Sequence, residues 1–412
     1  MSLSLALFSS PLNTPAGQTG QVTSLALASG RKLVFDVAHA ATLSFSLPGR
    51  HWTTALVQVG ISDVMAWWSD STAPLQRFRV TSSQIQSDTS GNINVTFTCS
   101  SYRLLAESWI FHDTDTRSWT GIAQTDLMWN IFNGGQTKSA ANLGVVQGLR
   151  CTTDTVRDRP ASTSTATPPV TTEYYPAGKT RLQALTELEA VIGGPEWDIR
   201  PSPTVLSQLT LDCWTQRGTT DPTVPLPLIA GSTVAAYTRQ VDFTSYANVV
   251  REQGASAQGA TTAAPVAYSP STGNPTGTPP EGRWERAVSS AAIVAVGVQE
   301  DADGELARDI QPLPTWALTL QQGYWRGPSD LWLGDVTRLL VQVTVDDPQP
   351  GSEYLLNVDL NVRVLRVDIT LDEGGGEIVT IAVGRAPITY NLFRQNLERR
   401  LALLELAGAV KR

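Results

Sequence analysis

Side chains with reactive sulfur or imidazole groups are scarce in this sequence: its 412 residues include three cysteines, three histidines and three methionines. Cys99, Cys151 and Cys213 lie far apart, their number is odd, and no Cys-x-x-Cys pair occurs. These features exclude a disulfide framework and the usual spacing of zinc ligands. We therefore interpret all three cysteines as buried or inert thiols.

Charge blocks and long apolar runs are also missing. Lys and Arg number 30 against 38 Asp and Glu, so the formal net charge is -8, and no basic run occurs. A surface that binds nucleic acid by neutralising phosphates is therefore not expected. No apolar run reaches the roughly 18 to 20 residues of a membrane span. The start, MSLSLALFSSPLN, lacks the basic region of a signal peptide, so we expect a chain that matures in a cytosol.

One stretch looks like the end of a phosphate-binding loop, because the sequence Gly-Lys-Thr at 178–180 precedes a helical pattern. In that motif a glycine comes five positions earlier, where this chain has Glu173, and Pro176 removes one of the backbone amides that would bind phosphate. Thr180 and Gln183 instead have the spacing of a capping box. The stretch therefore predicts a helix start, and we predict no nucleotide site.

The three histidines belong to no metal-binding or nucleophile motif. His39, His51 and His112 are not part of a His-Glu-x-x-His motif, and no Gly-x-Ser-x-Gly elbow accompanies them. His112 precedes Asp113 and Asp115, which could hold a metal, but a solvated turn explains this cluster as well. We predict no metal ligand here.

The acidic residues likewise form no complete motif. In EDADGELARDI, a calcium loop with Gly304 as its turn glycine would need Gln299 and Ile310 as ligands, which is unsuitable, so the segment predicts an acidic turn. Glu187 and Glu189 lie two apart on a predicted helix and face different ways. Two carboxylates converging across a cleft, as in a glycosidase, remain open at this stage. We predict no catalytic residue and no cofactor.

The 12 tryptophans raise the question of sugar stacking. Trp67 and Trp68 are the best candidates for a glycan or interface contact, because adjacent strand residues point to opposite faces of a sheet. A role in the core or in an interface is the simpler interpretation of these side chains.

Strand patterns dominate both ends of the chain. Period-two alternation recurs over residues 20 to 110, and strands return from Leu226 onward, ending in a hairpin around DEGGG. Helical spacing is predicted over 118–135 and 179–194, and EWDIRPS with QLTLDCW predicts a hairpin. Apolar residues at helical spacing predict an amphipathic helix at the C-terminus, with Leu392, Phe393, Leu397, Leu401 and Leu404 on one side. The predicted class is mainly β with an α+β insertion.

The order of several stretches resembles a known family. They include LSFSLPGRHWTTALVQVGISDVMAWW, VTFTCSSYRLLAESWIF, KTRLQALTELEAVIGGPEWDI, VDFTSYANVVREQG, LWLGDVTRLLV and VLRVDITLDEGGGEIVTIAVG. Together they resemble the baseplate hub, or tail-tip, proteins of long-tailed bacteriophages, a fold shared with the hub of contractile injection systems. More narrowly, the chain is similar to minor tail proteins of siphovirus-type phages that infect actinobacteria.

The resemblance implies a domain layout of two tail-tube-like β-barrels flanking a small mixed α/β domain. The expected parts are an N-terminal barrel at 1–112, the mixed domain at 113–225, a second barrel at 226–346 with a mobile insert at 255–282, a hairpin region completing it at 347–389, and the helix at 390–412.

The resemblance also implies a function and partners. We expect a homotrimer in the virion tail tip, with Leu397, Leu401 and Leu404 at the trimer contact. It would continue or close the tail tube, and it would bind a distal tail or tail tube protein, the tape measure protein, and other minor tail, tip or fibre proteins. DNA would only pass through the lumen, where a negative charge would limit sticking. The alternatives are a glycan- or receptor-binding tail protein and a tail-associated cell-wall hydrolase.

Overall fold

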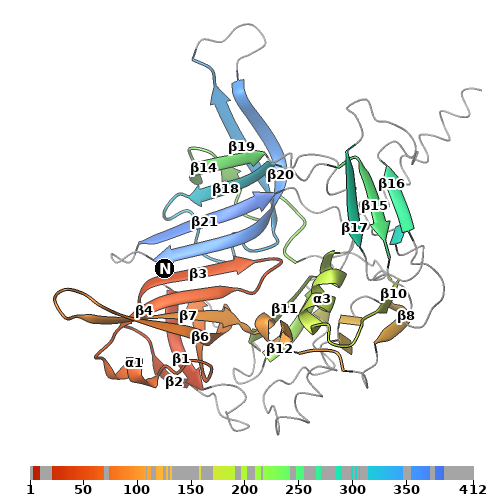
Figure 1. Cartoon of the computed structure of the whole chain (residues 1–412). Coiled ribbons are helices and arrows are strands. Elements are labelled where there is room, and N and C mark those ends of the chain that lie inside the picture. Colours follow the sequence, from red (N-terminus) through yellow and green to blue (C-terminus); the bar gives the residue numbers. More distant parts are fainter. Residues whose placement is uncertain are drawn as a thin grey trace, which may run out of the picture.

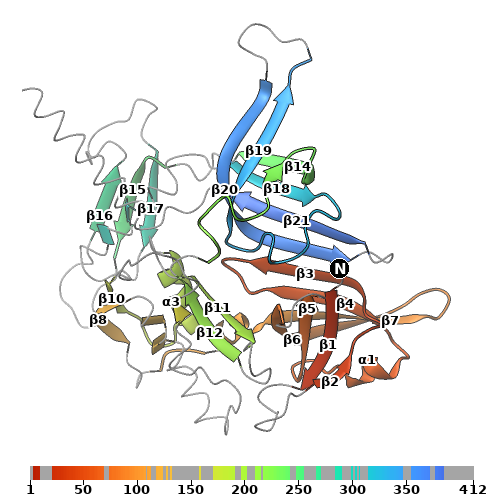
Figure 2. The same ribbon diagram turned by 180° about the vertical axis from the view of Figure 1, so that it is seen from behind.

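The described part of the chain is mainly β (Figures 1 and 2). A computed structural model describes residues 3–9, 21–68, 74–107, 109–112, 117–123, 127–128, 130–131, 157–158, 170–190, 196–201, 209–214, 217–241, 247–254, 266–270, 284–289, 298–299, 302–303, 306, 314–346, 354–371 and 376–384. The predicted C-terminal helix at 390–412, with Leu397, Leu401 and Leu404, lies outside these residues, as do Asp113, Asp115 and Cys151.

The N-terminal region is built from seven strands. They are β1 (Leu3–Ser9), β2 (Gln21–Ser24), β3 (Ser29–Asp36), β4 (Thr42–Pro48), β5 (Ser62–Trp68), β6 (Gln76–Ser87) and β7 (Ile93–Ser101), with the short helix α1 (Trp52–Leu56) after β4 and a 3-10 helix, η1 (Tyr102–Glu107), after β7. The strand predictions over residues 20 to 110 are confirmed. β1 was missed; its residues 5–8 are all apolar and buried, so it lacks the alternation of the other strands.

Alternation explains the packing of these strands. In β4 the alternate residues Leu43, Phe45 and Leu47 are buried. Phe45 lies opposite Phe97 of β7, and the centroids of the two rings are 5.4 Å apart. Their neighbours along each strand point to the other face. One face of the sheet therefore supplies the core.

The later part of the chain adds six strands to the same sheet. They are β13 (Leu228–Ile229), β14 (Val234–Val241), β18 (Pro314–Leu320), β19 (Val336–Thr344), β20 (Tyr354–Leu371) and β21 (Glu377–Gly384). β20 pairs with β19 over its first half and lies between β21 and β3 over its second. β20 and β21 form the hairpin predicted around DEGGG.

A single antiparallel ladder joins the two ends of the chain. β3 pairs with β20, so that Leu33 lies opposite Ile369 and Phe35 opposite Val367, all buried. The sheet has 13 strands, in the order β14-β18-β21-β20-β3-β4-β7-β6-β5-β1-β2, with β13 and β19 branching from β20. The mainly β class is confirmed. Among the described strands no pairing closes this sheet into a barrel, and the two-barrel layout stays a prediction.

A smaller α/β region packs beside the sheet. It contains β8 (Ser118–Ala123), β9 (Arg157–Asp158), β10 (Val170–Tyr174), α3 (Arg181–Ala190), β11 (Glu196–Pro201) and β12 (Leu209–Trp214). Its core includes Leu185 and Leu188 of α3 and Trp197 of β11. The helix after Lys179 and the antiparallel hairpin of β11 with β12 are confirmed.

Two predictions in this half of the chain were wrong in part. Residues 118–123 form strand β8 rather than the start of a helix, because they pair with β10. Among the described residues of this segment, Leu127, Met128, Asn130 and Ile131 are helical. The insert at 255–282, predicted as a mobile loop, contains strand β16 (Val266–Pro270), which pairs with β15 (Val249–Gln253). β17 (Glu285–Ser289) completes this separate three-stranded sheet.

Candidate functional site

The helix start at Thr180 is a capping box. The backbone N–H of Gln183 donates to Thr180 Oγ1 over 3.1 Å, and the N–H of Thr180 donates to Gln183 Oε1 over 3.2 Å. Lys179 forms an ion pair with Glu187 and lies over the ring of Tyr175. The side chains that resembled a phosphate loop are thus engaged in building the helix, which confirms that interpretation.

Glu187 and Glu189 point to different surroundings, as predicted. Glu187 is partly exposed and pairs with Lys179, whereas Glu189 is largely buried and pairs with Arg103 of η1. Burial raises the pKa of Glu189 to about 7, against the opposing effect of Arg103. The guanidinium of Arg103 also lies over the ring of Trp197 and donates to its backbone carbonyl over 2.7 Å. This contact fastens the α/β region to the end of β7.

A second buried ion pair fastens the α/β region to the main sheet. Arg363 of β20 contacts both carboxylate oxygens of Glu196, at 2.5 and 2.6 Å, and is 1% exposed. Arg363 also donates to the carbonyls of Gly334 and Arg217, at 3.0 and 3.1 Å. All the recorded hydrogen bonds of this guanidinium go to acceptors of buried residues. We call Glu196, Arg217 and Arg363 the ionic junction.

The ionic junction continues toward the N-terminal strands. Arg217 contacts Asp198 of β11 at 3.4 Å, and Gln76 of β6 donates to the same carboxylate over 3.3 Å. Burial lowers the pKa of Arg217, while Asp198 opposes that effect. The α/β region, β20 and β6 therefore meet in one polar network.

The N-terminal strands hold a further buried ion cluster. Asp63 of β5 accepts from Arg77 over 2.7 Å, from Arg79 over 2.6 Å and from the hydroxyl of Tyr102 over 2.7 Å. Burial and the Asp63 charge raise the pKa of Tyr102. Because the Asp63 carboxylate accepts from three donors, this cluster joins β5, β6 and η1.

Trp67 and Trp68 occupy opposite faces of β5. Trp68 is 2% exposed, and its Nε1–H donates to the carbonyl of Arg326 over 2.8 Å. Trp67 is partly buried and lies 5.6 Å from the ring of Phe8. Trp68 is therefore a core side chain, and the proposed glycan or interface contact of the partly buried Trp67 stays a prediction. Trp52 on α1 is 61% exposed, and sequence reasoning missed it.

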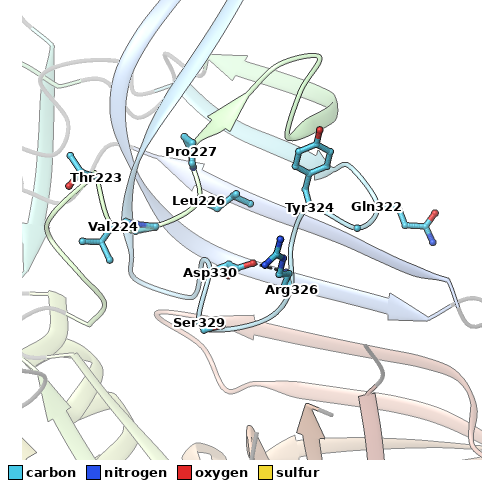
Figure 3. Close-up of a pocket in the computed structure, with 11 residues that line it drawn as sticks. Thr223, Val224, Leu226, Pro227, Gln322, Tyr324, Arg326, Ser329 and Asp330 are labelled. Carbon is cyan, nitrogen blue, oxygen red and sulfur yellow. Dashed lines mark hydrogen bonds between the residues drawn. The ribbon is translucent and has the colours of Figure 1, made fainter. Parts of the chain in front are cut away.

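An open pocket of about 630 Å³ lies beside the loop that Trp68 supports (Figure 3). Its walls are Thr223–Pro227, before β13, and the turn after β18, with Tyr324, Arg326 and Asp330 among the side chains. The backbone N–H of Leu226 donates to the carbonyl of Asp330 over 2.7 Å, which joins the two walls.

One polar group of the pocket holds its own wall together. The Asp330 carboxylate accepts from the backbone N–H of Arg326 over 2.9 Å, so it holds the turn. Among the lining residues described, no histidine or cysteine accompanies it. No group of three or more metal-ligating side chains occurs among the described residues. No helix in the described part of the chain is long and apolar enough to cross a membrane.

Comparisons with known proteins give a likeness in structure. Neither a protein-family model nor a curated protein matches the sequence. A tail protein from Neisseria meningitidis is 12% identical with a TM-score of 0.56, over 93% of this chain and 97% of that one. The 43 kDa tail protein of prophage MuSo2 from Shewanella oneidensis is 12% identical with a TM-score of 0.55, over 93% and 98%. A prophage tail protein from Listeria monocytogenes is 10% identical with a TM-score of 0.50, over 97% and 99%.

This chain has the fold of phage tail proteins. The match extends over nearly the full length of all three structures. In this chain, the ionic junction lies where the α/β region meets the 13-stranded sheet. Sequence reasoning missed it because Glu196 and Arg363 are 167 positions apart. No local spacing signals such a pair.

Proposed function

We propose that this protein is a structural component of a phage tail tip, a trimeric baseplate hub that continues or closes the tail tube. The observation that carries the proposal is the tail-protein fold, matched over more than nine tenths of the chain. The order of strand and helix motifs in the sequence supports the same assignment. The narrower assignment to siphovirus-type phages of actinobacteria rests on that sequence resemblance.

The proposed hub joins neighbours rather than transforming a substrate. Its partners are a distal tail or tail tube protein, the tape measure protein and tip or fibre proteins, and DNA passes through the lumen. The buried ion pairs support this role, because they tie the α/β region to the sheet and make a stiff unit from segments distant in sequence. A connector that transmits force benefits from such cross-links.

The solution mass of the purified full chain tests the trimer. Light scattering on a sizing column should give three times the 44.3 kDa of one chain. Replacing Leu397, Leu401 and Leu404 by Ser should dissociate the trimer if the C-terminal segment forms the contact. A trimer that survives the replacement would assign assembly to the β regions. A monomer at all concentrations would contradict the trimeric hub.

A glycan- or receptor-binding role is the second candidate, and the exposure of Trp52 favours it. Trp52 lies on α1, as does the exposed Leu56, and it is 61% exposed, whereas Trp68 is buried and Trp67 is partly buried. A glycan array with the full chain tests this role. Binding that is lost in Trp52→Ala and retained in Trp68→Phe would favour it, and no binding would remove it. Incubation with actinobacterial cell walls tests the hydrolase alternative, which lysis would support.

A further inference from the structure

The hairpin of β19 and β20 extends away from the rest of the molecule, at the top of Figures 1 and 2. We call its outer part, Val341–Thr344 with Tyr354–Leu360, the hairpin arm. In the described part of the chain, the strands of the arm pair only with each other, since β13 joins β19 only at Leu339 and Leu340. A two-stranded ribbon is marginally stable in water unless another surface packs on it.

The hairpin arm is amphipathic. The register places Val343 opposite Leu356, Val341 opposite Val358, and Leu339 opposite Leu360. Side chains at alternate positions share one face. Val343, Leu356, Val358 and Leu360 therefore form an apolar face, which continues outward from the buried core residues Leu339 and Val341.

This apolar face is incompletely covered, and its most exposed side chain, Leu360, lies at the base of the arm opposite Leu339. Val343, Leu356 and Val358 contact the core but remain half-buried, and Leu360 is 38% exposed. A row of partly exposed apolar side chains that leaves the core marks a surface that another molecule can cover.

The opposite face of the hairpin satisfies its own polar groups. Arg338 and Asp359 form two hydrogen bonds, at 2.8 and 2.7 Å, and Gln342 donates to Asn357 over 3.2 Å. The two charges thus neutralise each other on the face that points away from the apolar strip. The apolar face itself carries no charge.

We propose that the apolar face of the hairpin arm packs against the same face of further copies of this chain, around the rotation axis of the assembly. The chain carries a formal net charge of -8, so copies repel unless their contact surfaces are neutral. This face is neutral, and Val and Leu side chains can meet their own kind without burying an unpaired polar group. In a symmetric assembly, equivalent arms project in the same direction and can converge.

The number of arms that meet rests on the proposed trimer, whereas the contact itself does not. The apolar strip continues the core of the sheet within each chain. Arms that meet would therefore connect the cores of the three chains. The contact is therefore distinct from the one proposed for Leu397, Leu401 and Leu404.

Cysteine cross-linking of the full chain tests the contact. Leu360→Cys places a thiol on the apolar face, and Asn357→Cys places one on the polar face of the same strand as a matched control. A disulfide needs Cα atoms within about 7 Å, so only side chains that meet across copies are linked. Under mild oxidation we expect a copy-to-copy disulfide for Leu360→Cys that is absent from Asn357→Cys and from the unchanged chain, which gives the background of Cys99, Cys151 and Cys213.

Association measured by sedimentation provides the second readout. The double change Leu356→Ser and Leu360→Ser should weaken association about tenfold or more, and Gln342→Ser on the polar face should leave it unchanged. An assembled chain without a disulfide at position 360 would overturn this contact while leaving the trimer intact. A disulfide at position 360 joins only two chains in an assembly of any size, so the sedimentation mass decides the number of copies: a dimer by mass with the disulfide would retain the contact and contradict the trimer. A monomer without cross-links would overturn the contact.

Discussion

Removing Arg363 is expected to destabilise the fold strongly, because it leaves a buried carboxylate without its main partner. The Arg363 and Glu196 side chains are only 2% and 12% exposed and meet through two contacts. Arg363→Met keeps most of the aliphatic volume but removes the charge. Breaking one side of a buried pair costs about 3 to 5 kcal/mol. The carbonyls of Gly334 and Arg217 also lose a donor, so we expect the upper part of that range.

The control for this change is an ion pair with similar geometry on the surface. Arg338 and Asp359 also form two hydrogen bonds, but their side chains are 56% and 50% exposed. Arg338→Met should therefore leave the free energy of unfolding nearly unchanged. Urea unfolding followed by tryptophan fluorescence measures both free energies. The buried Trp197, adjacent to Glu196 on β11, reports on the α/β region.

A double change separates pairing from packing. Combining Arg363→Met with Glu196→Gln removes both charges, so its cost should be smaller than the sum of the two single changes by about 1 to 3 kcal/mol. If Arg363→Met costs no more than Arg338→Met, the reasoning about a buried charge is refuted. Additive costs in the double variant would show that the two side chains act independently.

Three smaller changes test other parts of the structure. Gly334 has a φ of +91°, and a Cβ there would lie 2.3 Å from the carbonyl oxygen of Arg217, whereas Gly231 has a φ of +78° and open space around it. Gly334→Ala should therefore lower the unfolding temperature much more than Gly231→Ala does. Equal shifts would contradict this. The raised pKa of Glu189, about 7, means that the folded chain binds more protons than the unfolded chain between its ordinary pKa and 7. Stability from this group should therefore fall as pH rises through that window, and Glu189→Gln should flatten the dependence of unfolding free energy on pH; an unchanged profile would refute the assignment. Thr180→Ala should cost about 1 kcal/mol in urea unfolding by removing the helix cap, and Thr180→Ser should cost little; equal costs would contradict the capping role.

Several elements could be predicted from sequence because their signals are local. The alternation in β4 follows from one buried and one solvated face, and the helix after Lys179 follows from the capping box at Thr180. Where a local pattern had a competing pairing, the prediction was wrong. Residues 118–123 carry apolar spacing that fits a helix, but pairing with β10 makes them a strand.

The sequence by itself determined the class of the fold, because strand alternation, turns and caps depend on neighbours a few residues apart. Only the tertiary structure decided which strands pair and which side chains are buried. The pairing of β3 with β20, the contact of Glu196 with Arg363 and the burial of Trp68 under the Arg326 loop join positions far apart in sequence. Such contacts form only when the whole chain closes on itself. The exposure of Trp52 and the uncovered face of the hairpin arm were decided at the same step.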